Sequence, residues 1–73
     1  MISRELKNKI EKSFNEIQIN LENNYKDLAI TAKKNTEEII DSLHKSGELA
    51  DKYYKKYSEK LDEYKKRMEN YHH

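Results

Sequence analysis

Apolar residues recur in a regular pattern along the first two thirds of the chain. Their spacings are 3, 4 and 4 residues, repeated without interruption from residue 3 to residue 43. This 11-residue period, about 3.67 residues per turn, places one side chain per turn along a nearly straight line on an α-helix. The simplest prediction is one continuous helix over residues 3–45, roughly 60 Å long. Its positions are Ser3, Leu6, Ile10, Phe14, Ile17, Leu21, Tyr25, Leu28, Ala32, Thr36, Ile39 and Leu43.

A second amphipathic segment follows a helix-end signal. His44 and Lys45 stand before Ser46 and Gly47, and cationic residues followed by glycine are typical of a helix C-terminus. We therefore expect a turn at residues 46–47. After it the apolar spacing changes to the 4-3 pattern of heptads, which predicts a second helix over residues 48–71. Its positions are Ala50, Tyr54, Tyr57, Leu61, Tyr64, Met68 and Tyr71.

These patterns predict an all-α fold and a single helical domain over residues 1–73. The chain has no proline and one glycine, so strand and turn signals are scarce. The expected architecture is an antiparallel helical hairpin with a long first helix, pairing into a dimeric bundle. One alternative carries the heptad back through Gly47 and gives a rod-like helix in a parallel coiled-coil dimer. Another ends a helix at Asn23 and caps the next with Asn24, giving a three-helix bundle with helices of about 22 residues.

The hairpin has a consequence for function. A helix of about 60 Å facing one of about 36 Å leaves roughly 16 residues of the first stripe uncovered, an apolar strip typical of an interface. We expect this strip to pair with a second copy in a homodimer, or to bind a helix of another protein. The tyrosines of the second helix either hold it against the first or face the partner. The candidate partner-binding residues are Leu6, Ile10, Phe14, Ile17, Tyr54, Tyr57 and Tyr64.

Composition and charge narrow the possible functions. Of the 73 residues, 34% are hydrophobic and none is cysteine, which excludes disulfides and zinc-thiolate sites. The net charge of +1 provides no global attraction to nucleic acid or to an anionic membrane. Residues 52–67 nevertheless carry seven positive and three negative charges interleaved with tyrosines. The alternative function is therefore a nucleic-acid-binding helix that uses residues 52–67, with tyrosines stacking on bases and lysines contacting phosphates.

Other segments bear on location and chemistry. The longest apolar run is three residues, so we expect no transmembrane segment, little contact with a membrane surface, and a cytoplasmic location. Asp41 precedes His44 by three residues, the acid-x-x-His spacing of di-iron bundles, but on a helix Asp41 would lie about 140° from the core. His72 and His73 are either native or the start of a purification tag, and two adjacent histidines are no metal site. We expect no enzyme, no cofactor and no metal.

Composition bears on the source of the protein, and shape bears on its family resemblance. Lys, Ile, Asn and Tyr, whose codons are rich in A and T, make up 33 of 73 residues, which suggests a low-GC bacterium or its phage. A helical hairpin with the short turn Lys45-Ser46-Gly47 resembles, in shape and length, the WXG100-like partners of type VII secretion. That family carries Trp-x-Gly at the turn and Tyr-x-x-x-Asp/Glu in the second helix, and both motifs are missing here. The favoured function is a small adaptor, inhibitor or assembly subunit, and a WXG100-like secretion partner is a further alternative.

Overall fold

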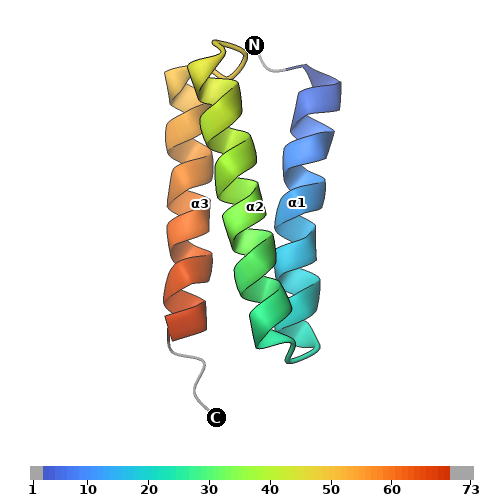
Figure 1. The fold of residues 1–73 in the computed structure, drawn as a ribbon. Helices are drawn as coiled ribbons and strands as arrows, with labels where there is room; N and C mark the ends of the chain where they lie inside the picture. Colours follow the sequence, from blue (N-terminus) through green and yellow to red (C-terminus); the bar gives the residue numbers. More distant parts are fainter. Residues whose placement is uncertain (1–2, 70–73) are drawn as a thin grey trace.

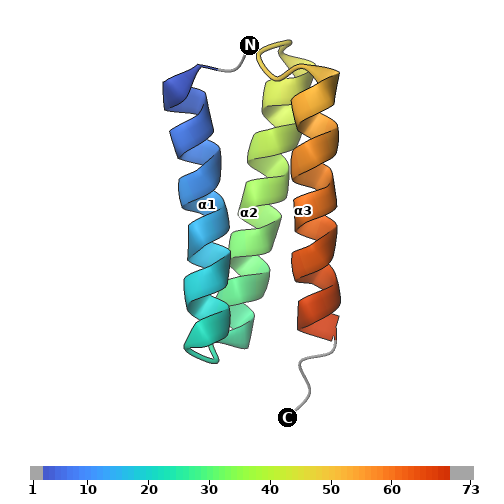
Figure 2. The same cartoon turned by 180° about the vertical axis from the view of Figure 1, so that it is seen from behind.

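Three helices of similar length make up the structure. The computed structural model describes residues 3–69, with α1 at Arg4–Glu22, α2 at Lys26–Lys45 and α3 at Asp51–Glu69. The chain runs along α1, returns along α2 and reverses again into α3 (Figure 1). Both α1 and α3 pack against α2 and flank it, as the view from behind also shows (Figure 2). The expected all-α class is confirmed for the residues that the structure describes, over which no strand occurs.

The chain reverses between α1 and α2 at a point where the hydrophobic pattern runs on without a break. Asn23 ends α1, and Asn24 takes the left-handed conformation with φ +62°. The N–H of Asn24 donates to the carbonyl oxygen of Leu21 at 3.2 Å, and the N–H of Tyr25 donates to that of Asn20 at 2.8 Å. This pair of bonds is the Schellman motif, in which asparagine is the usual substitute for glycine. The single helix predicted through residue 45 is therefore wrong.

The three-helix alternative places this break correctly but gives Asn24 the wrong role. Asn24 closes the C-terminus of α1 and does not cap α2. Tyr25 stands at the N-cap of α2 and forms no capping bond through its side chain. Asp27 in the first turn of α2 supplies negative charge that favours the positive end of the helix dipole.

The second turn lies where glycine predicts it. Helix α2 ends at Lys45, and Gly47 takes φ +85°, a conformation that favours glycine. Helix α3 begins at Asp51, three residues later than expected, because Leu49 folds in to cover the end of the core and its N–H donates to the oxygen of Leu43 at 3.0 Å. The expected helix end at residue 71, with Tyr71, His72 and His73, lies outside the described residues.

The core combines large side chains from α1 and α3 with small ones from α2. Because α2 lies between the other two helices, alanines on it leave room for the larger residues on both sides. Tyr25 and Leu28, which continue the apolar stripe through the turn, are each 55% exposed. The buried apolar residues are Ile10, Phe14, Ile17, Leu21, Ala29, Ala32, Ile40, Leu49, Tyr57, Leu61 and Met68.

The strip that was expected to stay uncovered is buried inside the chain's own bundle. Ile10, Phe14 and Ile17 are each at most 1% exposed. The three helices have 19, 20 and 19 residues, so α1 is not long enough to extend beyond the helices packed with it. The ring of Phe14 stacks on Tyr57 and Tyr64, with centroids 5.8 and 6.0 Å apart. The break at residues 23–25 thus replaces a long uncovered helix by a short covered one.

Candidate helix-binding groove

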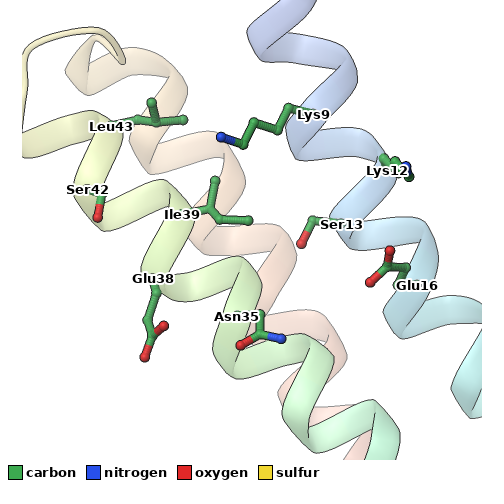
Figure 3. Close-up of a pocket in the computed structure, with 9 residues that line it drawn as sticks. All are labelled: Lys9, Lys12, Ser13, Glu16, Asn35, Glu38, Ile39, Ser42 and Leu43. Atoms are coloured by element: carbon green, nitrogen blue, oxygen red, sulfur yellow. The ribbon is translucent and has the colours of Figure 1, made fainter.

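A groove runs between α1 and α2, with α3 lying behind it (Figure 3). Its volume is about 660 Å³, and its length covers the middle of both helices. Because α3 covers the opposite face of the α1–α2 pair, this face keeps side chains that no third helix contacts. The lining residues are Lys9, Lys12, Ser13, Glu16, Asn35, Glu38, Ile39, Ser42 and Leu43.

The apolar part of the groove comes from α2. Ile39 and Leu43 are half-buried, pack against the core and also line the groove. The next residue along the chain, Ile40, is buried in the core. Adjacent residues on a helix differ by about 100° in direction, so Ile39 and Ile40 project to different sides of α2. Ile39 and Leu43 thus form an apolar strip one helical turn long beside α1.

Charged side chains form the rim of the groove. Lys9 and Lys12 stand on the α1 wall with Glu16 one turn further on, and Glu38 stands on the α2 wall. The amino group of Lys9 reaches across toward α2 (Figure 3). Within the part of the chain that the structure describes, none of these four side chains forms an ion pair. An apolar strip bordered by charges of both signs is typical of a surface that binds a helix.

Two of the predicted tyrosines hold α3 against α1. Tyr57 and Tyr64 stack on Phe14, and the Tyr64 hydroxyl donates to Oε1 of Gln18 at 3.2 Å. Arg67 donates to the same oxygen at 3.1 Å. Burial raises the pKa of Tyr57 above the ordinary tyrosine value, and the negative charge of Glu11 on α1 adds to that increase. Both tyrosines thus join α3 to α1 within the chain. Leu6, another predicted partner-binding residue, is half-buried near the start of α1.

Tyr54, the third predicted tyrosine, belongs to a cluster that joins α2 to α3. Its ring stacks on His44 with centroids 4.0 Å apart, and its hydroxyl donates to Oδ1 of Asp41 at 2.9 Å. That hydrogen bond and the charge of Asp41 raise the pKa of Tyr54. His44 pairs with Asp51 at 2.6 Å and not with Asp41. Among residues 3–69 no group of three or more metal-ligating side chains occurs.

The positive charges of α3 are partly used in packing. The Lys60 amino group lies 4.8 Å from the centroid of the Phe14 ring, and the Arg67 guanidinium lies 5.3 Å from that of Tyr64. Tyr57, one of the tyrosines interleaved with these charges, is buried. This arrangement does not favour nucleic-acid binding, because stacking needs aromatic faces open to solvent.

Sequence reasoning did not identify the groove. Ile39 and Leu43 belong to the apolar stripe and were expected to lie in the core. The sequence pattern does not mark the polar lining residues, because the side on which α3 packs determines which residues face a groove. In comparisons with models of protein families, with curated proteins and with solved structures, no significant match to this chain was found. None of the helices described is long and apolar enough to cross a membrane.

Proposed function

We propose that the protein acts by protein–protein contact, as an adaptor, inhibitor or assembly subunit, and that the α1–α2 groove is its contact surface. The observation that supports this proposal is the strip of Ile39 and Leu43, half-exposed on the face of the α1–α2 pair that α3 does not cover. A helix placed in the groove would complete a four-helix arrangement with the three helices of the chain.

The groove suits an amphipathic helix. Such a helix presents apolar anchors one turn apart, which match Ile39 and Leu43, spaced by four residues. Its flanking polar residues would meet Lys9 and Lys12 on one side and Glu38 on the other. These charges are exposed, so they lose little hydration until the partner binds, and they select for orientation and register more than for affinity.

Catalysis is not proposed for this surface. A catalytic group needs a site that excludes water and shifts its protonation, and the charged side chains of the groove are open to solvent. Lys9, Lys12, Glu16 and Glu38 therefore serve as recognition groups in this proposal.

Photo-crosslinking in the cells that produce the protein tests the proposal. A benzophenone amino acid replaces Asn35 or Ser42, at different levels of the groove, and Asn15 on the exposed side of α1 serves as the control. We expect covalent adducts from the two groove positions and none from position 15. Equal labelling at all three positions, or no adduct at either groove position, would contradict a specific contact surface here. The mass of an adduct also shows whether the bound chain is another copy or a different protein.

A further inference from the structure

We infer that a second copy of the same chain packs on the face that holds the groove, with its α1 antiparallel to the first α1. This inference rests on the proposed function and adds the partner and its orientation. The evidence is the order of charged and polar groups along the two walls of the groove.

The two ends of the α1 wall carry opposite charges, so they match each other when the wall is reversed. Along it lie Lys9 and Lys12, then Ser13, then Glu16. A two-fold axis that crosses α1 midway between Lys12 and Ser13 places Lys9 opposite the partner's Glu16, and the symmetry repeats this pair. Lys9 and Glu16 are about 10.5 Å apart along one helix, so they do not neutralise each other within a chain.

The same axis also pairs polar groups of the α2 wall with those of the partner's α2 wall. Ser13 is hydrogen-bonded to Thr36, so the axis crosses α2 next to Thr36. Two-fold symmetry about the point between residues 36 and 37 places Glu38 opposite the partner's Asn35, whose amide donates to a carboxylate. The position of the axis was set by α1 alone, and the match on α2 is an independent observation.

The axis also gives full overlap and covers an exposed apolar residue. It crosses α1 and α2 near the middle of each, so two copies overlap along nearly their whole length. Leu28, Asn35 and Ser42 are spaced by seven residues and therefore lie along one face of α2. Leu28 is 55% exposed, and in this arrangement it lies opposite the partner's Lys45, two residues beyond the end of the partner's groove at Leu43. A second copy thus covers apolar surface that the single chain leaves in water.

Charge reversal tests the arrangement by sedimentation equilibrium. Lys9→Glu alone and Glu16→Lys alone each place like charges opposite one another twice in a homodimer. We expect the wild-type chain to be a dimer and each variant to self-associate at least about tenfold more weakly. An equimolar mixture of the two variants, and the double variant Lys9→Glu/Glu16→Lys, should regain the wild-type affinity. Lys55→Glu and Asp62→Lys, a pair of the same spacing on the exposed face of α3, are the matched controls and should leave it unchanged.

Specific results would overturn the inference. One is a wild-type chain that stays monomeric up to about 1 mM. Another is a dimer whose affinity the reversals at positions 9 and 16 do not change, while circular dichroism shows the variants folded. Crosslinks from Ser42 to a different protein, with no self-adduct, would overturn the second copy and leave the proposed function intact. Absence of any adduct at either groove position would contradict the proposed function and the second copy together.

Discussion

The hydroxyl of Ser13 in α1 donates a hydrogen bond to Oγ1 of Thr36 in α2, at the base of the groove. The Thr36 hydroxyl donates its own hydrogen bond to the carbonyl oxygen of Ala32 at 2.8 Å. Because a hydroxyl has a single hydrogen to donate, Ser13 must be the donor in the bond between Ser13 and Thr36. Thr36 is fully buried, and Ser13 can donate to its hydroxyl oxygen only while the two helices keep their register. This polar contact therefore fixes how far α1 is displaced along α2.

The hydrogen bond between Ser13 and Thr36 predicts that the losses from removing each hydroxyl are not additive. Thr36→Val keeps the shape but leaves the Ser13 hydroxyl without its protein partner, and we expect the free energy of unfolding to fall by about 1–2 kcal/mol. The double variant Ser13→Ala/Thr36→Val should lose less than the sum of the single losses, because the two groups interact. Urea denaturation followed by circular dichroism measures all three. Strictly additive losses would show that the two hydroxyls do not depend on each other.

The left-handed conformation of Asn24 predicts opposite effects on the free energy of unfolding for its replacement by glycine and by alanine. Asn24→Gly should keep or raise the free energy of unfolding, because glycine adopts the left-handed conformation without steric cost. Asn24→Ala should lower it by about 1 kcal/mol, since alanine clashes in that conformation. Thermal and urea unfolding of both variants check the order. An alanine variant more stable than wild type would indicate that the helix continues through residue 24.

The buried phenol of Tyr57 predicts a loss of stability at alkaline pH. Its pKa is raised by burial, so the folded chain holds the proton more tightly than the unfolded chain. The resulting stabilisation is fully present below the unfolded pKa of about 10 and is lost as pH rises above it. Tyr57→Phe has no such proton, and lysine titration affects both proteins alike. The free energy of unfolding should therefore fall less steeply in the variant between about pH 9 and pH 11; parallel curves would contradict the burial of this hydroxyl.

His44 makes two contacts with α3, a ring stack on Tyr54 and a polar contact with Asp51, and two substitutions of His44 distinguish their contributions to stability. The Asp51 side chain is 99% exposed, so its contact with His44 contributes little in water. Stacking on Tyr54 is the larger effect, about 0.5–1.5 kcal/mol. His44→Ala should therefore destabilise the chain by about that amount, whereas His44→Phe should retain most of the wild-type stability. If both variants lost the same stability, the pairing with Asp51 would be the important interaction.

The sequence pattern predicts the helical class and most of the core. The heptad of the last helix places Tyr57, Leu61 and Met68 on one face, and all three are buried. The 3-4-4 pattern does the same for Ile10 and Phe14. These predictions succeed because a buried face needs apolar residues at a helical period, whatever lies opposite it.

The pattern fails at the reversal between α1 and α2. Tyr25 and Leu28 keep the apolar phase through the turn, although both side chains end up exposed. The signal for the break was the pair Asn23 and Asn24, because asparagine tolerates the left-handed conformation that ends a helix. The groove could not be predicted from the sequence for a different reason. Its lining residues depend on the side of α2 against which α3 packs, and the spacing of apolar residues in α2 does not indicate that side.

A single distance tests the three-helix arrangement on which the groove depends. Spin labels are attached at Asn8→Cys and Lys45→Cys, both exposed positions in a chain with no other cysteine, and the labelled chain is diluted with unlabelled protein so that only distances within one chain contribute. The start of α1 lies at the same end of the bundle as the end of α2 (Figure 1). The bundle therefore predicts a distance below about 25 Å, since packed helices lie 8–10 Å apart and the labels add their own length. A distance near 55 Å, the length of 37 residues of unbroken helix, would contradict it.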